Sequence, residues 1–191
     1  MSFLNHKGLV QVIFTQNIDS LESKASIPLE KVVFAHGNFV EAHCSGCQKD
    51  CEVDLLEKHI CEGKVLFCED EKCKQPIKHK IVFYGENLPP KFFEKMNEIE
   101  DCDLGIVMGT SLKVMPFNFL PYKLKNTSWR VVANMEKVGS EGGSGFNYDN
   151  LSSKDLFLGG KTDEIIHRIL KDCGWQEEFE NFVKTKSKKE D

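Results

Sequence analysis

The segment Val10-Gln11-Val12-Ile13-Phe14-Thr15-Gln16-Asn17-Ile18-Asp19 decides the fold class, because in it an apolar run passes directly into a cluster of small polar residues. The run from Val10 to Phe14 is typical of a buried strand. A second short apolar strand, Val32 to Ala35, ends in the same way at His36-Gly37. Ligands of open α/β sheets bind just beyond the carboxyl ends of the strands, so we expect these two strand ends to line one crevice.

The polar residues at these strand ends suit a polar ligand. Asparagine and glutamine can hydrogen-bond a sugar hydroxyl or a carboxamide through donor and acceptor together, and histidine is the side chain best matched to proton transfer near neutral pH. Each residue also has an ordinary structural explanation. Polar residues after a strand commonly form a loop, a histidine beside a glycine is commonly a turn residue, and Asp19 can cap a short helix over Leu21 to Ala25.

The complete string Thr15-Gln16-Asn17-Ile18-Asp19-Ser20-Leu21-Glu22, followed by Ala35-His36-Gly37, resembles the sirtuins, the NAD-dependent protein-lysine deacylases. The resemblance implies that Asn17 and Asp19, together with Gln16, hold the nicotinamide end of the cofactor. It also implies that His36 is the general base.

Composition limits the remaining possibilities. The 191 residues are enough for one domain with a substantial core and a small inserted module. The net charge of −5 gives no sign of the excess positive charge that is typical of nucleic-acid binding. No apolar run approaches the roughly 20 residues of a membrane helix. We therefore expect neither nucleic acid nor a membrane as a direct partner. Eight cysteines without a secretory signal pattern indicate a reducing compartment, where metal ligation is more common than disulfides.

Two close cysteine pairs predict a structural zinc site. Cys44 and Cys47 form a C-x2-C pair, and Cys68 and Cys73 form a C-x4-C pair. Pairs with this spacing and separation are typical of four thiolates around one zinc ion, which leaves no open position for chemistry. Three further residues remain alternative ligands, namely Cys51, Cys61 and His43. A short helix is expected between the pairs, over Glu52 to Ile60.

The segment after the cysteines predicts the acceptor side of the site. Ile81 to Glu86 reads as an extended apolar run that ends at a glycine, and a helix with Phe92, Phe93, Met96 and Ile99 on one face follows it. The run resembles a sirtuin segment that lines the acyl-lysine tunnel and pairs with the substrate peptide by β-strand addition. The resemblance implies four substrate-binding residues: Val82, Phe83, Gly85 and Glu86.

A second set of strand ends predicts the other half of the cofactor site. A buried strand is expected over Leu104 to Met108 and a second one over Arg130 to Ala133, with a helix from Phe117 to Leu124 between them. Gly109-Thr110-Ser111 closes the first strand, and Asn134-Met135-Glu136 closes the second. Glycine permits close approach of backbone to ligand, and hydroxyl, amide and carboxylate groups suit phosphate and ribose.

Both strings match sirtuin patterns. The resemblance implies that the following residues bind the cofactor: Gly109, Thr110, Ser111, Asn134, Glu136 and, near the adenine, Thr162. A last strand over Asp155 to Leu158 and a helix that buries Ile165, Ile166, Ile169 and Leu170 are expected to complete this half.

The expected fold is α/β, a Rossmann-like parallel sheet with a small inserted zinc-binding module. Residues 1–39 and 82–183 are expected to form a partial NAD-binding domain, residues 40–81 a zinc-ribbon-like module, and residues 184–191 a disordered tail. Glu141 to Gly145 is expected to be a flexible loop. Sirtuins also carry an upstream strand that ends in a Gly-Ala-Gly-Ile-Ser type loop, which these residues lack. We therefore expect the first, central strand of the sheet to be absent from this chain.

The resemblance implies a transferase that consumes NAD to remove an acetyl group from lysine in a protein or peptide, which releases nicotinamide and O-acetyl-ADP-ribose. It implies NAD and one structural zinc ion as cofactors, and location in the nucleus, the cytoplasm or both. The alternative is a truncated sirtuin that cannot turn over and acts at most as a zinc-containing binding module.

Overall fold

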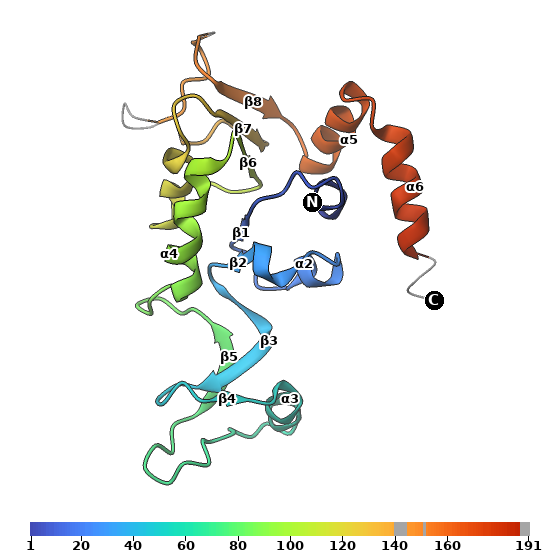
Figure 1. Cartoon of the computed structure of the whole chain (residues 1–191). Coiled ribbons are helices and arrows are strands. Elements are labelled where there is room, and N and C mark those ends of the chain that lie inside the picture. The colour runs from blue at the N-terminus through green and yellow to red at the C-terminus, as the bar shows by residue number, and fades with distance from the viewer. Residues whose placement is uncertain (140–144, 151, 188–191) are drawn as a thin grey trace. The chain divides into compact units, whose positions relative to one another are not determined.

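The computed structural model describes residues 1–139, 145–150 and 152–187 of the chain (Figure 1). Their contacts divide the chain into two compact units, and each unit is described by itself. Unit 1 consists of Met1–Asn5 and Val12–Lys95, and unit 2 consists of His6–Gln11 and Met96–Asp191. The expected loop at residues 141–145 lies mostly outside the described residues. No helix among the described residues is long and apolar enough to cross a membrane.

Unit 1 contains the strand pair that the sequence predicts. Strand β1 (Ile13–Thr15) pairs in parallel with β2 (Val32–Phe34), and Thr15 lies opposite Phe34. Val32 and Val33 are almost completely buried. The prediction of a strand from Val10 to Phe14 is wrong at its start. The 3-10 helix η1 (Leu29–Lys31) directly precedes β2, so β2 offers only three residues for pairing.

Short helices surround this strand pair. Helix α1 (Ser2–His6) opens the chain, and Gly8 follows it with a φ of 72°, as expected for a helix that ends at a glycine. Helix α2 (Leu21–Lys24) follows β1. Helix α4 (Pro90–Met96) contributes Phe92, whose fully buried ring meets Phe14 of β1 edge-on, with 5.6 Å between the ring centroids. This aromatic contact anchors β1 within unit 1.

The cysteine-containing part of unit 1 is an antiparallel sheet of three strands in the order β4-β3-β5. Its strands are β3 (Gly37–Cys44), β4 (Asp50–Cys51) and β5 (Ile77–Ile81). Helix α3 (Val53–Cys61) agrees within one residue at each end with the helix expected over 52–60. The prediction of an extended run over residues 81–86 is wrong. The strand is the mixed sequence Ile77–Ile81, and the apolar residues beyond it form a turn in which Tyr84 is fully exposed.

Unit 2 contains a parallel sheet of three strands in the order β6-β7-β8. Its strands are β6 (Leu104–Met108), β7 (Trp129–Asn134) and β8 (Asp155–Gly159). The strand positions are confirmed, but the expectation that β6 is buried is wrong. Leu104 is 47% exposed and Ile106 is 36% exposed. These two residues share one face of the strand, and among the described residues β6 is paired only with β7, so it forms an edge of its sheet.

Helices complete unit 2. The 3-10 helices η2 (Asn97–Asp101) and η3 (Phe117–Lys123) flank β6, and α5 (Thr162–Asp172) follows β8 and buries Ile165 and Leu170. In the predicted row of four apolar residues on α5, Ile166 and Ile169 are only half-buried. In the helical face predicted over residues 92–99, Phe93 is 49% exposed.

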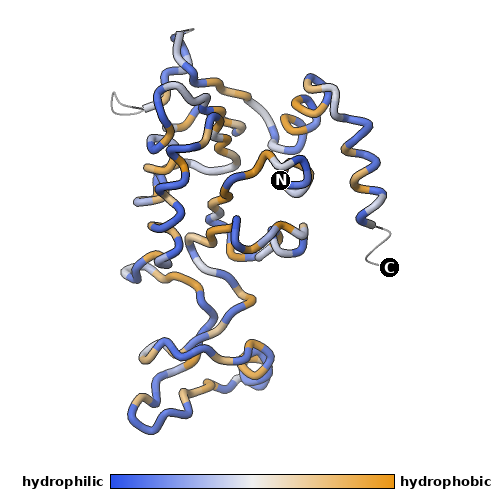
Figure 2. The backbone as a smooth tube through the Cα atoms, in the orientation of Figure 1, coloured by the Kyte–Doolittle hydropathy of each residue, from blue (hydrophilic) through white to orange (hydrophobic). Residues whose placement is uncertain are grey.

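A final helix, α6 (Gln176–Ser187), was not predicted. Lys7 forms an ion pair with Glu178 at 2.7 Å and lies over the ring of Trp175, and His6 packs on Phe182. These contacts stabilise the helix even though hydrophilic residues predominate along it (Figure 2). The expected disordered tail therefore starts too early, because residues 184–187 are helical, and residues 188–191 lie outside the described residues.

The core of unit 2 is aromatic as well as aliphatic. Buried Val132 and Phe146 belong to a cluster against which Tyr122, Tyr148 and Phe157 pack. The rings of Phe146 and Tyr148 are stacked, with 5.4 Å between their centroids. This packing fixes the β7–β8 pair and the segments that lead into it.

Among the described glycines of unit 1, Gly37 leaves the least room for a Cβ atom. Its φ is 78°, and a Cβ atom there would lie 1.7 Å from the carbonyl oxygen of Lys80 on β5. Gly8 has a similar φ of 72° but no atom within 4 Å of the same position. We expect Gly8→Ala to lower the free energy of unfolding by about 1–2 kcal/mol, the cost of left-handed backbone for an L-residue. Gly37→Ala adds the clash and should cost about 3 kcal/mol or more.

Urea unfolding of the two variants and the parent chain, followed by circular dichroism, measures this difference. Equal losses for the two substitutions would contradict the close β3–β5 approach at Gly37.

Candidate functional site

The parallel pairing of β1 and β2 places His36 beside Gln16. The backbone N–H of Ala35 donates to the carbonyl of Thr15 at 2.9 Å, which extends the ladder past both strand ends. The imidazole Nδ1 of His36 then lies 3.2 Å from the carbonyl oxygen of Gln16. Because a carbonyl oxygen only accepts, Nδ1 carries the proton, and Nε2 is the basic nitrogen of the neutral ring. Two strand ends thus bring an imidazole and an amide-rich turn together, as predicted.

The turn after β1 is held by its own polar side chains. The hydroxyl of buried Thr15 accepts the N–H of Asn17 at 3.2 Å, and the carboxylate of Asp19 accepts the N–H of Leu21 at 3.1 Å. Asp19 therefore binds the first N–H of α2, although Ser20, and not Asp19, occupies the N-cap position. The side chains of Asn17 and Asp19 are exposed to solvent. They can contact a ligand that enters beside His36.

The predicted acceptor segment lies next to His36 within unit 1. The N–H of Val82 donates to the carbonyl of His36 at 3.0 Å. The turn that follows is closed by Glu86, whose carboxylate accepts the N–H of Phe83 and the ammonium of Lys78, each at 2.8 Å. The hydrogen bond from Lys78 and that from the Phe83 N–H hold the pKa of Glu86 below its ordinary value. Gly85 sits at the turn with a φ of 89°.

The second set of predicted residues gathers at the carboxyl end of the β6-β7-β8 sheet in unit 2. The side-chain amide of Asn134 donates to the carbonyl of Thr110 at 3.2 Å, which joins the ends of β7 and β6. The carbonyl of Asn134 accepts the N–H of Gly160, at the end of β8, at 3.1 Å. Gly109 has a φ of 60°. Three further predicted residues follow the strands within three positions along the chain, namely Ser111 after β6, Glu136 after β7 and Thr162 after β8.

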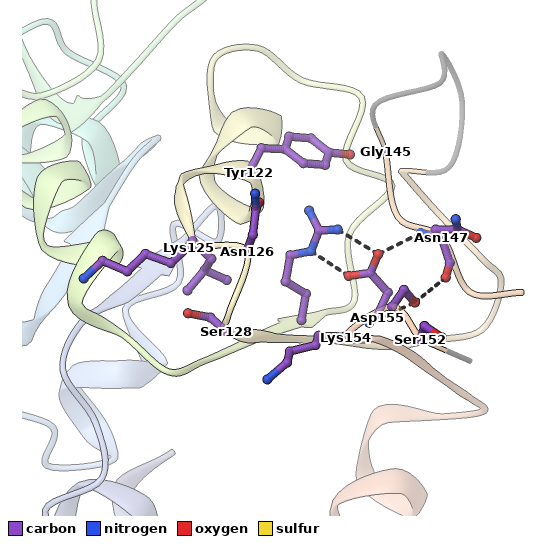
Figure 3. A pocket seen from close by; sticks show the side chains of 12 residues that line it. Tyr122, Lys125, Asn126, Ser128, Gly145, Asn147, Ser152, Lys154 and Asp155 are labelled. Carbon is purple, nitrogen blue, oxygen red and sulfur yellow. Dashed lines mark hydrogen bonds and ion pairs between the residues drawn. The ribbon is translucent and has the colours of Figure 1, made fainter. Parts of the chain in front are cut away.

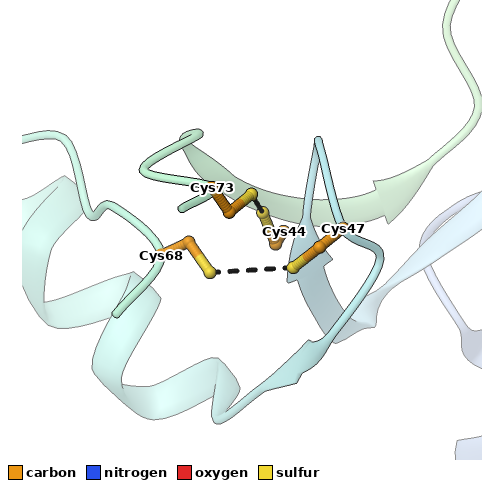
Figure 4. A group of neighbouring side chains, drawn as sticks. All are labelled: Cys44, Cys47, Cys68 and Cys73. Atoms are coloured by element: carbon orange, nitrogen blue, oxygen red, sulfur yellow. Dashed lines mark hydrogen bonds between the residues drawn. The ribbon is translucent and has the colours of Figure 1, made fainter. Parts of the chain in front are cut away.

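The four predicted zinc ligands form one cluster (Figure 4). Their sulfur atoms all lie within 4.8 Å of one another, with Cys44 and Cys73 at 3.4 Å and Cys47 and Cys68 at 3.7 Å. Four thiolates at about 2.3 Å from a tetrahedral zinc ion stand about 3.8 Å apart, so the cluster fits one ion. The ligand group found among the described residues does not include Cys51, Cys61 or His43.

The environment of Cys44 favours its thiolate form, whereas the pKa values of the Cys47, Cys68 and Cys73 thiols are raised above their ordinary value. Burial alone would raise the pKa of Cys44, but hydrogen bonds from the backbone N–H groups of Cys47 and Gly46 lower it to about 6. The N–H of Gly46 lies 3.3 Å from the Cys44 sulfur. A deprotonated thiol is the form that binds metal. The cluster is therefore suited to one structural zinc ion, because its four ligands fill a tetrahedral site.

Some features of the site were not predicted from sequence. Lys78 holds Glu86 and also lies over the ring of Phe83, with 4.3 Å from its nitrogen to the ring centroid. It comes from the β-strand that sequence reasoning missed, and its charge gave no signal among 25 lysines and arginines. Thr15 was noted only as one of several polar residues, although its buried hydroxyl fixes the turn.

Comparisons with known proteins identify the family of this chain. Residues 1–116 match the model of the Sir2 family. The chain is 39% identical to the NAD-dependent deacetylase sir2A of Dictyostelium discoideum over 187 residues, covering 96% of this chain and 36% of the relative. It is 37% identical to the NAD-dependent protein deacetylase hst2 of Schizosaccharomyces pombe, covering 95% of this chain and 52% of the relative. It is 34% identical to the NAD-dependent protein deacetylase sirtuin-2 of Danio rerio, covering 96% of this chain and 51% of the relative.

A solved structure described as "The Structural basis for Sirtuin Substrate affinity" superposes with a TM-score of 0.74 at 30% identity. The match covers 91% of this chain and 69% of the solved one. This chain therefore belongs to the Sir2 family, with an α/β fold that contains parallel sheets and a four-cysteine module. It spans about a third to a half of the length of these curated relatives. Their names support the deacetylase interpretation and do not favour the binding-module alternative.

The zinc site can be tested by substituting one ligand. We expect the parent chain to carry about one zinc ion, and Cys68→Ser to lose it, because three thiolates leave the tetrahedral site incomplete. Cys61→Ser is the matched control, since Cys61 is exposed and lies outside the cluster. Metal content by mass spectrometry and thermal unfolding with and without a zinc chelator measure both effects. Zinc retained in Cys68→Ser, or lost in Cys61→Ser, would show that the ligand set is wrong.

Proposed function

We propose that this chain carries part of the catalytic core of an NAD-dependent protein-lysine deacetylase. The proposal rests mainly on one observation, the His36 imidazole held against the Gln16 carbonyl at two paired strand ends, in a chain of the Sir2 family. When bound, NAD would supply the ribose carbon with which the acyl oxygen of acetyl-lysine forms a bond as the bond to nicotinamide breaks, and a water molecule would be consumed as lysine and O-acetyl-ADP-ribose are released. Acetyl is the proposed acyl group.

The residues at the end of β1 orient the nicotinamide portion of the cofactor. The amide of Asn17 can donate and accept at once, which suits a carboxamide or a ribose hydroxyl. Asp19 offers carboxylate oxygens while its Oδ1 also accepts the first N–H of α2. Gln16 contributes its carbonyl to His36, and this contact fixes which ring nitrogen is basic. His36 then removes a proton from a ribose hydroxyl through Nε2, as a general base.

The acetylated peptide is proposed to bind at the turn of residues 82–86. Val82 and Phe83 would line the acyl-lysine side chain, and Gly85 with Glu86 would complete the peptide side. The hydrogen bond between the Val82 N–H and the His36 carbonyl supports this placement, because it fixes the segment beside the proposed base. Backbone pairing with a peptide gives affinity through main-chain hydrogen bonds and demands little of the peptide's sequence.

The far end of the cofactor is proposed to bind at the carboxyl edge of unit 2. Gly109, Thr110 and Ser111 would approach its phosphate and ribose groups, Asn134 and Glu136 its adenosine ribose, and Thr162 its adenine. The hydrogen bond between Asn134 and the Thr110 carbonyl supports this assignment, since it fixes two of these residues at one strand edge. We also propose a nuclear or cytoplasmic location, and we propose neither nucleic acid nor a membrane as a direct partner.

The proposed role of His36 predicts that its substitution lowers the rates in two assays to different extents. We expect His36→Ala to lower formation of deacetylated peptide by about 10²–10⁴-fold, because general-base catalysis is lost. Exchange of labelled nicotinamide into NAD should fall much less, since the base acts after nicotinamide has left. His59→Ala is the control, because His59 is a half-buried residue of α3 that lies outside the proposed site, and its Nδ1 is 2.8 Å from the Leu55 carbonyl of the same helix. Equal loss in both assays would contradict the assigned role.

Asn17 should affect the earlier step. We expect Asn17→Ala to lower nicotinamide exchange and deacetylation together, each by about tenfold or more, because a hydrogen-bond partner of the leaving group is removed. Asn97→Ala, an exposed asparagine in η2, should change neither by more than about twofold. Normal exchange by Asn17→Ala would place the nicotinamide elsewhere.

A further inference from the structure

A polar pocket of about 420 Å³ lies at the amino ends of β7 and β8, entirely within unit 2 (Figure 3). It is lined by the segment that follows η3, by the first residues of both strands and by the segment that leads into β8. The proposed cofactor residue Asn134 is at the opposite end of β7 from Arg130, which lines this pocket. Four residues of strand separate them by about 13 Å. The pocket is therefore distinct from the proposed cofactor edge.

The base of the pocket is a rigid ion pair. Arg130 donates from Nε to one carboxylate oxygen of Asp155 at 2.6 Å and from Nη2 to the other at 2.7 Å. Asp155 also accepts the N–H of Asn147 at 2.8 Å, and its side chain is only 2% exposed. The guanidinium lies over the rings of Phe146 and Tyr122, at 4.9 Å and 5.8 Å from their centroids. The direction of the guanidinium is thus fixed by three groups, the Asp155 carboxylate and the two aromatic rings.

This ion pair leaves donors of Arg130 for a ligand. A guanidinium has five N–H groups, and the bonds to Asp155 engage two of them. The Arg130 side chain is 23% exposed and lines the pocket, so a ligand there can reach it. A planar guanidinium that is already locked in place loses little further entropy when it binds phosphate. The carboxylate of Asp155, in contrast, is consumed by its three donors.

The remaining charges of the lining are positive. Lys125 and Lys154 flank the pocket, so that three cations stand against one buried carboxylate. The ion pair of Lys125 with Asp101 is long, at 3.6 Å, and both side chains are more than half exposed, so it holds the lysine weakly. Lys154 lies over the ring of Trp129 at 5.5 Å. Amide and hydroxyl groups of Asn126 and Ser152 complete the polar lining.

We propose that this pocket binds a small organic phosphate, the phosphate monoester group contacting Arg130 between the two lysines. The excess of two positive charges matches a dianion, and the polar lining offers hydrogen bonds to its oxygens and to a small polar remainder. The volume lies within the range of small-molecule pockets, about 300–1,000 Å³. A ligand held there would join the segment after η3 to the segment before β8, and so would stabilise unit 2.

The test is a titration of the isotope-labelled chain with glycerol phosphate and with inorganic phosphate, followed by amide NMR spectra. We expect saturable shifts at Asn147, Ser153 and Lys154, and no saturable shifts with glycerol alone. The double variant Lys125→Gln/Lys154→Gln should weaken binding by about tenfold or more, because two exposed cations are removed without disturbing the buried ion pair. Lys171→Gln, an exposed lysine on α5 outside the pocket, is the charge control and should bind as the parent does.

Three results would overturn the proposal. The first is no saturable binding up to about 10 mM, tenfold above a weak dissociation constant of about 1 mM. The second is a set of shifts confined to residues 109–111 at the proposed cofactor edge. The third is a loss of affinity in Lys171→Gln as large as that in the double variant. Saturable binding of inorganic phosphate but not of glycerol phosphate would also contradict it, because the pocket would then accept only the bare ion. The test does not depend on deacetylase activity, so the two proposals can fail separately.

Discussion

The parallel pairing of β1 with β2 is the constraint on which the candidate site depends. Only three residue pairs form it, yet they align the carboxyl ends of the two strands side by side. The hydrogen bond from Ala35 to Thr15 carries this alignment one residue further. His36 and Gln16 consequently meet, although twenty positions separate them along the chain. A slip by one residue would turn the imidazole to the other face of the strand pair.

Strand β3 links this strand end to the metal module. It begins at Gly37, directly after His36, and ends at Cys44, the most buried cysteine of the cluster. Its length places the two ends on the order of 20 Å apart, so zinc bound by the cysteines is too far away to act on a group beside His36. The metal would instead fix the far end of β3 and β5, while the glycine allows their close approach at the near end. The structural metal site and the proposed catalytic histidine therefore lie at opposite ends of β3.

The sequence was informative where the determining interactions are local. Paired cysteines indicate a metal cluster through their spacing, and their four sulfur atoms do lie together. An apolar run that stops at polar residues indicates a strand end, and β1 does end at Thr15. The prediction failed where the partner is remote. Ile77–Ile81 carries lysines and a histidine, so nothing in it marks the strand that pairs with β3. Helix α6 depends on Lys7, and the Arg130–Asp155 pair joins residues from different strands, so neither could be predicted from local pattern.

The central claim is that the aligned carboxyl ends of β1 and β2 form a binding site for the nicotinamide portion of NAD. The most direct measurement is an NMR titration of the labelled chain with NAD that follows the backbone amides at these two strand ends. The account predicts that Asn17 and His36 shift together and follow a single dissociation constant. No saturable shift at either residue would contradict it.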